Sequence, residues 1–271
     1  MYKVIESFQK GKKNISQCED GMVITSAFAA VIDGSTSKGD YDWGDKTSGQ
    51  IARDVIGESL QALSPDAALD DIIIQLTEAL NRRTLEVTGK EAKELPAYNR
   101  LTASIVIYSD RLKKVWQIGD CPCLTDGMLH DNSKPEEHIL AAKRAKNLKT
   151  ALANGWTVKE LMIKDCGRES ILQDLKEECL FQNKKFALLD GTPVYKEGIK
   201  TIDVSTCKEL VLASDGYPFL YPTLAESEEA LQQQLSEDPL CIYHFKATKG
   251  LRPGYNSFDD RTYLRLALMT D

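Results

Sequence analysis

Acidic residues stand at the ends of several short apolar segments in this sequence. They occur at four places: Glu19-Asp20 and Asp33-Gly34 on either side of the run Met22–Ala30, Asp215-Gly216 after Leu210–Ala213, and Asp259-Asp260 before Arg261–Leu268. Each segment is short and rich in aliphatic or β-branched residues, which is typical of a buried strand. A carboxylate at a strand end is held rigidly at the edge of the core, and a neighbouring glycine lets a ligand approach the backbone.

Carboxylates gathered at strand ends predict a site for hard divalent cations. Oxygen ligands suit Mg²⁺ and Mn²⁺. Two such ions about 4 Å apart polarise a phosphoryl group and create a hydroxide nucleophile. Asp-Gly is also a common turn dipeptide, so each pair taken alone fits an ordinary turn. The recurrence of the pattern along the chain favours a metal site.

Composition limits the class of protein. The net charge of −7 argues against a nucleic-acid-binding surface. No apolar stretch reaches membrane-spanning length, and the start of the chain lacks an apolar signal core. Seven cysteines without a secretion signal indicate reduced thiols, and the three histidines show no metal-ligand spacing. We therefore expect a soluble, cytoplasmic protein with no nucleic-acid or membrane partner.

Hydrophobic periodicity divides the chain into the elements that must hold these acids. Strands are expected at 2–9, 22–30, 102–108, 115–120, 123–129, 185–190, 198–214 and 261–269. Helices are expected at 46–63, from a Ser64 cap through about residue 80, within 135–180, and at 223–248. The turns between 102 and 129 are too short for parallel crossovers, so this stretch is predicted to be an antiparallel meander.

The strands dominate both ends and the middle of the chain, with helix pairs between them. This order predicts an α+β fold in which two packed antiparallel sheets are flanked by helices. No linker divides the sequence, so we expect one domain, 1–271, with a helical, charged insert at about 135–180. Within the insert, the basic run from Lys143 to Lys149 is interpreted as a solvated helix face, with substrate docking as the alternative.

The order of the motifs resembles that of the PP2C-type metal-dependent serine/threonine phosphatases. The matching segments are Glu19-Asp20, Phe28–Gly34, Leu101–Ser104, Gln117–Asp120, Leu212–Gly216 and Asp259–Thr262. Each motif alone is weak, but six in this order and spacing cover essentially the whole chain. The resemblance implies a four-layer α-β-β-α sandwich, in agreement with the fold class above.

The resemblance also implies a ligand set for two Mn²⁺ or Mg²⁺ ions. Asp33 would bridge the two ions. The backbone carbonyl of Gly34 and the carboxylate of Glu19 would complete the protein ligands of one ion. Asp215 and Asp259 would hold the other.

Two further acids have implied roles. Asp20 would orient a metal-bound water, so Asp33 and Asp20 are the expected catalytic residues. Asp120 matches a position linked to a third, weaker metal. A hydroxide bridging the two core ions would attack phosphorus in line, without a covalent phospho-enzyme.

Four positions depart from the family pattern. Ser35 stands where many members have a histidine proposed to protonate the leaving group, so a water would take that role. Ile15 replaces an arginine that clamps the phosphate, and Phe219 replaces an acid near the third metal. Asp260 replaces the commoner asparagine, a change we expect to be tolerated. Weak candidates for the missing clamp are Lys12, Lys13, Lys249 and Arg252.

Three functions remain open from the sequence. The first is a cytoplasmic, signalling phosphatase for phosphoserine or phosphothreonine in proteins. The second is a phosphatase for a small phosphorylated metabolite, which the missing arginine leaves open. The third is a non-catalytic, metal-binding regulatory module, which the departures at Ser35, Ile15 and Phe219 favour. The sequence does not indicate the oligomeric state or choose between Mn²⁺ and Mg²⁺.

Overall fold

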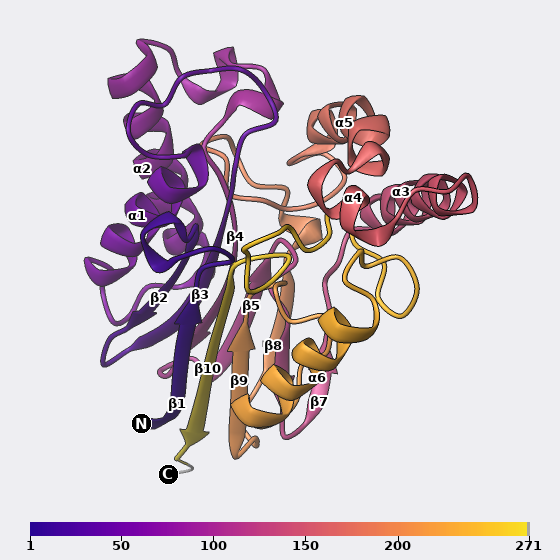
Figure 1. Ribbon diagram of the computed structural model, residues 1–271. Helices are drawn as coiled ribbons and strands as arrows, with labels where there is room; N and C mark the ends of the chain where they lie inside the picture. The colour runs from indigo at the N-terminus through magenta and orange to yellow at the C-terminus, as the bar shows by residue number, and fades with distance from the viewer. Residues whose placement is uncertain (270–271) are drawn as a thin grey trace.

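The computed structural model describes residues 1–269, and its strands form two five-stranded sheets (Figure 1). The first sheet has the order β1 (Tyr2–Lys10), β10 (Arg261–Leu268), β9 (Glu209–Ala213), β6 (Cys123–Thr125) and β7 (Met128–His130). The second has the order β2 (Asp20–Ile24), β3 (Phe28–Ser35), β4 (Thr102–Ser109), β5 (Lys114–Ile118) and β8 (Lys200–Asp203). Neighbouring strands are antiparallel throughout both sheets.

Helices cover the outer faces of the two sheets. Helices α1 (Ser48–Gln61) and α2 (Leu69–Thr88) pack on the second sheet, and α6 (Leu224–Glu237) lies against the first (Figure 1). The helices α3 (Pro135–Ala153), α4 (Val158–Ile163) and α5 (Cys166–Glu178) form the helical insert beside the sandwich. Short 3₁₀ turns lie at Ile15–Gln17, Ala92–Glu94, Ala97–Asn99, Cys179–Phe181 and Lys196–Gly198. The predicted α-β-β-α sandwich is confirmed.

The central strands are buried on both faces. Along β3, Ala29 and Val31 face the core between the sheets, whereas Ala30 and Ile32 face α1 and α2. This alternation follows from the two-residue period of a strand. Burial on both faces explains why the sequence of β3 is continuously apolar rather than alternating. Each fully buried valine or isoleucine stabilises the fold by about 1.5–3 kcal/mol.

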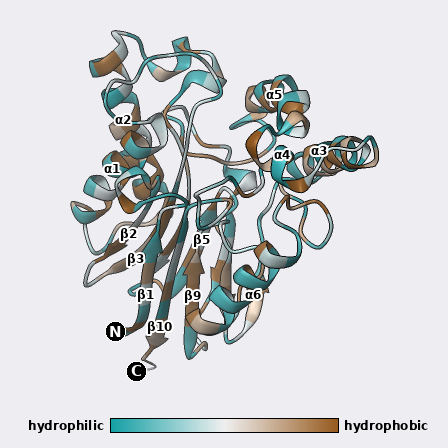
Figure 2. Cartoon of the chain, viewed as in Figure 1, coloured by the Kyte–Doolittle hydropathy of each residue, from teal (hydrophilic) through white to brown (hydrophobic). Residues whose placement is uncertain are grey.

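The helices outside the sheets are amphipathic. In Figure 2 they carry both hydrophobic and hydrophilic segments, as expected for helices with one face on a sheet. Helix α1 buries Ile51, Ile56 and Leu60. It begins after Thr47, whose hydroxyl accepts a hydrogen bond from the Gln50 backbone at 3.2 Å, while the Gln50 side chain accepts one from the Thr47 backbone at 3.1 Å. None of the helices in residues 1–269 is both long enough and apolar enough to cross a bilayer.

The apolar run 22–30, predicted as one strand, is instead a hairpin. Strand β2 ends at Ile24 and β3 begins at Phe28. The Thr25 hydroxyl closes the turn, because it accepts hydrogen bonds from the backbone N–H of Ala27 and Phe28 at 3.2 and 2.9 Å. Asp33 therefore lies inside β3, where it pairs with Asp20 of β2, and not at a turn.

Further predicted strand arrangements are wrong. The single strand expected at 123–129 is the β6–β7 hairpin, and 198–214 contains two strands of different sheets, β8 and β9. The stretch 102–129 is not one meander, because β4 and β5 lie in the second sheet and β6 and β7 in the first. The chain leaves the second sheet at Gly119, whose φ of 93° is accessible to glycine at little cost. The stretch 185–190 forms no strand; Leu189 makes only an isolated bridge to Ala103.

Two predicted helix boundaries are also wrong. Helix α2 begins at Leu69 rather than after Ser64, and the Asp71 side chain accepts a hydrogen bond from the Ala68 N–H at 3.0 Å. Helix α6 ends at Glu237, so residues 238–248 are not helical. There the Asp238 carboxylate accepts backbone hydrogen bonds from Ile242 and Tyr243 at 2.9 and 2.6 Å. Such local side-chain acceptors compete with helical hydrogen bonding.

Candidate active site

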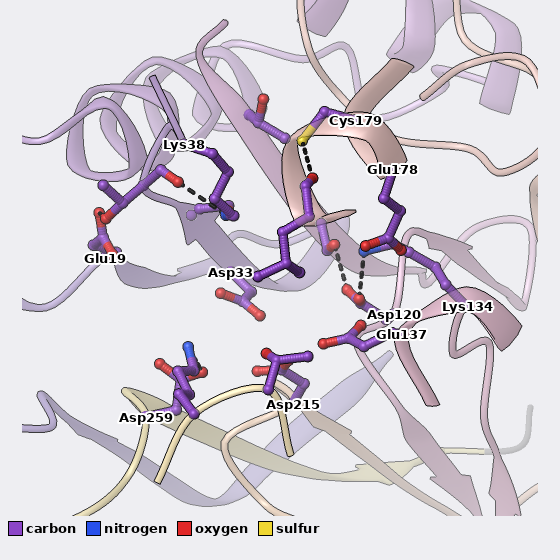
Figure 3. A pocket seen from close by; sticks show the side chains of 18 of the residues that line it. Glu19, Asp33, Lys38, Asp120, Lys134, Glu137, Glu178, Cys179, Asp215 and Asp259 are labelled. Carbon is purple, nitrogen blue, oxygen red and sulfur yellow. Dashed lines mark hydrogen bonds and ion pairs between the residues drawn. The ribbon is translucent and has the colours of Figure 1, made fainter. Parts of the chain in front are cut away.

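The acidic strand ends predicted from the sequence meet at one cavity. Its volume is about 550 Å³, and its lining includes Glu19, Asp33, Asp215 and Asp259. Strands of both sheets contribute to it. Figure 3 shows Asp33 facing Asp215 and Asp259 across the cavity, with Glu19 at one side and Asp120 at the other.

The β2–β3 hairpin places Asp20 and Asp33 side by side. The two residues are register partners, and the Gly34 N–H donates to the Glu19 carbonyl at 3.1 Å. Any side chain at Gly34 would clash, because a Cβ there would lie 2.3 Å from the Gly49 carbonyl oxygen. The glycine is therefore required for α1 to pack closely against this edge of β3.

Two threonines hold the Glu19 carboxylate. The hydroxyls of Thr36 and Thr47 donate to its Oε1 at 2.6 and 2.5 Å. Its Oε2 lies 3.6 Å from the Lys12 ammonium. The role of the threonines was not predicted, because they lie in a polar loop and at a helix cap. Thr47 thus both begins α1 and orients a predicted metal ligand.

Asp260 joins the two sheets beneath the cavity. Its two oxygens accept hydrogen bonds from the backbone N–H of Lys12 at 2.6 Å and of Glu19 at 3.0 Å. The end of β9 reaches the same point through Gly216, where a Cβ would lie 1.9 Å from the Asp260 carbonyl oxygen. The contacts of Asp260 therefore hold Glu19 close to Asp215 and Asp259.

An acidic cluster is formed by the buried carboxylates of Asp20, Asp33, Asp215 and Asp259, which repel one another. Burial, together with the charges of neighbouring acids, raises the pKa of Asp20 and Asp33 well above the ordinary value. Burial and the charge of Asp259 raise the pKa of Asp215 to about 7. The Oδ2 atom of Asp20 is buried and has no hydrogen-bond partner among the described residues. The centre of the cluster therefore lacks a compensating positive charge.

Lysines approach the cluster from its rim. The Lys12 ammonium lies 3.4 Å from Asp259 and 3.2 Å from Asp260, and Lys249 also pairs with Asp259. Burial opposes ionisation of Asp259, but the two lysines more than offset it and hold its pKa below the usual value. Asp259 is thus the one central acid whose charge is already balanced.

The donor atoms of the cluster fit hard divalent cations. All are oxygens, and one buried oxygen of Asp20 has no partner within residues 1–269. As the side chains stand, no three His, Cys, Asp or Glu residues within 1–269 are close enough together to hold an ion. Instead, Lys12 and Lys249 pair with Asp259. Binding of an ion would require these ammonium groups to move away from Asp259.

Asp120 differs from the other acids because both of its oxygens are engaged. Ser104 donates to Oδ1 at 2.5 Å, and the Lys134 ammonium donates to Oδ2 at 2.7 Å. Burial opposes the charged form, yet Lys134 holds the pKa of Asp120 below the usual value. The oxygens that a third metal would use are therefore already bound by protein groups.

The helical insert forms another wall of the cavity, with basic, apolar and acidic side chains. Helix α5 of the insert contributes Arg168, Leu172, Leu175 and Glu178 to the lining. Ser35 also faces the cavity, and its hydroxyl accepts a hydrogen bond from the Lys38 ammonium at 3.1 Å. The insert is therefore one wall of the candidate site.

The candidates for a phosphate clamp lie in different places. Lys12, Lys249 and Arg252 line the cavity. Lys13 is exposed and does not line it. Ile15, at the place of the family arginine, is 61% exposed and also lies outside the lining. The clamp candidates that line the cavity thus come from the residues after β1 and from the loop before β10.

No protein-family model matches the chain, and no curated protein matches its sequence. Among solved structures, the serine/threonine phosphatase PstP/Ppp of Mycobacterium tuberculosis matches at 15% identity over 99% of this chain and 98% of that chain, with a TM-score of 0.48. RsbX in complex with magnesium matches at 12% identity over 99% of this chain and 100% of that chain, with a TM-score of 0.47. PppA, a key regulatory component of T6SS in Pseudomonas aeruginosa, matches at 15% identity over 99% and 98%, with a TM-score of 0.47. With TM-scores below 0.5, these matches assign no activity or residue role to this chain.

Proposed function

We propose that this protein is a metal-dependent phosphatase that hydrolyses phosphoserine and phosphothreonine in proteins, as part of cytoplasmic signalling. The observation that carries the proposal is the group of mutually repelling carboxylates from both sheets around one cavity (Figure 3). Such a group is stabilised by bound cations. The order of its motifs along the chain, which resembles that of the PP2C-type phosphatases, supports the same function.

Two Mn²⁺ or Mg²⁺ ions would be held by these residues. The residues that would hold them are Asp33, with Glu19 and the Gly34 carbonyl for one ion and Asp215 and Asp259 for the other. When bound, the ions neutralise phosphate charge and activate the attacking water.

The chain's own residues would orient the reactants. The unpartnered Oδ2 of Asp20 is beside Asp33 and would accept a hydrogen bond from the water that attacks phosphorus. Lys12 and Lys249, once released from Asp259, would donate to the phosphate oxygens. Lys38 and Ser35 supply N–H and O–H donors at the opposite side of Asp33, where a leaving-group oxygen could take a proton. Positioning of this kind accounts for much of the rate enhancement in phosphoryl transfer.

Two other functions are each favoured by one observation. The cavity volume of about 550 Å³ is in the range of small-molecule sites, and α5 forms part of its wall, which favours a phosphorylated metabolite as substrate. The ion pairs from Lys12 and Lys249 to Asp259 favour a regulatory module in which lysines take the place of metal ions.

A substrate panel separates these functions. Purified protein is incubated with Mn²⁺ and with a phosphothreonine peptide, a sugar phosphate, a nucleotide or a small aryl phosphate, with Asp33→Asn as the matched inactive control. The proposal predicts that kcat/KM is highest for the peptide and that Asp33→Asn removes it. A preference for the sugar phosphate or nucleotide would support the metabolite enzyme. No release of phosphate from any substrate would support the regulatory module.

A further inference from the structure

Lys134 is a buried cation beside the acidic cluster. It is the residue before α3, and its ammonium binds Asp120 at 2.7 Å. The two side chains are 16% and 10% exposed. The ammonium also lies 5.3 Å from the centre of the Phe186 ring, a distance that is favourable for a cation–π contact. Lys134 is thus held from two sides at the cavity wall.

Asp120 is fixed on its other side by the second sheet. Its Oδ1 accepts a hydrogen bond from Ser104 at 2.5 Å, and Ser104 is the register partner of Asp33 in the β3–β4 pair. These contacts form a series of four residues that leads outward from the proposed two-ion site: Asp33, Ser104, Asp120 and Lys134. The outermost group of this series is the Lys134 ammonium, which is a protein group and not an exchangeable ion.

Further carboxylates surround the same ammonium. Glu137 and Glu178 line the cavity on this side, and Figure 3 shows both next to Lys134 and Asp120. The Oε1 atom of Glu178 is buried without a hydrogen-bond partner in the described part of the chain. Without Lys134, these three acids would lose the ammonium that lies among them and binds Asp120.

The position where the resemblance places an additional acid also lacks a ligand for an ion. Phe219, which stands where the resemblance places an additional acid, packs edge to face on Phe245 with 6.2 Å between ring centres. Together with the two engaged oxygens of Asp120, this arrangement does not fit a third metal ion.

We infer that Lys134 is a cation built into the chain that takes the place of a third metal ion beside Asp120, so that the protein binds two divalent ions and not three. The inference rests on the proposed function. A lysine does not exchange with solvent, so the positive charge on this side of the cavity is present at every metal concentration. The ion pair between Lys134 and Asp120 also connects the start of the helical insert to the sandwich. One contact therefore positions both the cavity wall formed by the insert and the positive charge on that wall.

The test is the number of Mn²⁺ ions bound, measured by isothermal titration calorimetry and by the electron paramagnetic resonance of free Mn²⁺. Wild type should bind two ions, and Asp120→Asn should still bind two. Lys134→Met should bind a third, weaker ion among Asp120, Glu137 and Glu178. The double variant Lys134→Met with Asp120→Asn should return to two.

Turnover gives a second readout. At a Mn²⁺ concentration that fills two sites, Lys134→Met should lose about tenfold or more in kcat, and additional Mn²⁺ should restore part of it. Lys134→Arg should keep the two-ion stoichiometry. The matched control is Lys143→Met, which removes an exposed lysine of α3 that pairs with Asp174 away from the cavity. It should leave stoichiometry and turnover unchanged.

The outcomes are distinguishable. A third ion in wild type that disappears in Asp120→Asn, or a folded Lys134→Met variant that still binds two, would overturn the inference and leave the proposed function intact. No Mn²⁺ binding by wild type would overturn both. Thermal unfolding of each variant checks that it is folded, and the Asp120→Asn stoichiometry remains a test even where Lys134→Met does not fold.

Discussion

Substitution of Asp215 by asparagine should stabilise the metal-free protein and weaken its stabilisation by metal. Asp215 lines the cavity, and burial with the charge of Asp259 raises its pKa from 3.8 to about 7. The folded state therefore resists ionisation of this group. The destabilisation is absent below about pH 4, grows as the pH rises, and is complete above about pH 7.

The size of the effect follows from this rise in pKa. For an isolated group it corresponds to at most about 4 kcal/mol. Interaction with Asp259 and Lys249 reduces what one substitution can recover, so we expect about 2 kcal/mol at pH 8. For a chain of this length that is an increase of about 4–8 °C in Tm. At pH 4 the difference from wild type should be near zero.

The assay is thermal unfolding in EDTA and in excess Mn²⁺ at several pH values. Mn²⁺ at about a hundred times its Kd should stabilise wild type by about 2.7 kcal/mol per occupied site, and the variant by markedly less. Asp45→Asn, which removes an exposed acid, is the matched control and should change neither Tm nor its pH dependence. A variant that is less stable than wild type in EDTA at pH 8, or that responds fully to Mn²⁺, would refute the reasoning.

Three further predictions concern other parts of the structure. Asp33→Ala should lower phosphopeptide turnover by about a thousandfold or more because it removes the shared ligand; near-normal kcat would exclude Asp33 from that role. Lys12→Met should raise KM for the phosphopeptide by about tenfold if the ammonium binds phosphate, and an unchanged KM would assign Lys12 to structure alone. Arg144→Met should lower the free energy of unfolding, measured by urea denaturation, by about 3–5 kcal/mol. The reason is that the fully buried guanidinium binds Asp165 at 2.7 Å and the Leu240 carbonyl at 2.9 Å, and its loss leaves a charge unpaired; an unchanged urea midpoint would show that these contacts contribute little.

The fold and the acidic positions could be predicted because their signals are local. The apolar segment before Asp215 and the one after Asp259 are each continuous in sequence, and strand periodicity alone identifies them. Both acids do stand next to strand ends in the structure. The hairpin within 22–30 was missed because its turn at Thr25 contains none of glycine, proline, asparagine or aspartate, which are the strongest turn signals.

Lysines and arginines that make long-range contacts were the hardest to assign from the sequence. Lys134 meets a partner 14 residues away and a ring in another loop. Arg144 was interpreted as part of a solvated face, yet it is fully buried, because Asp165 and the loop after α6 enclose it. Helices lie at 135–178, but nothing in the residues of this stretch indicated that α5 would line the cavity. The assignment of the chain to one domain stays a prediction.

The central claim is that the acidic cluster holds the metal ions that phosphate hydrolysis requires. The most direct test is a Mn²⁺ titration of EDTA-treated wild-type protein, in which bound Mn²⁺ and the initial rate on a phosphothreonine peptide are measured in the same samples. We predict no hydrolysis without metal and a rate that rises in parallel with occupancy of two sites. Hydrolysis that persists in EDTA, or full occupancy without hydrolysis, would contradict the account.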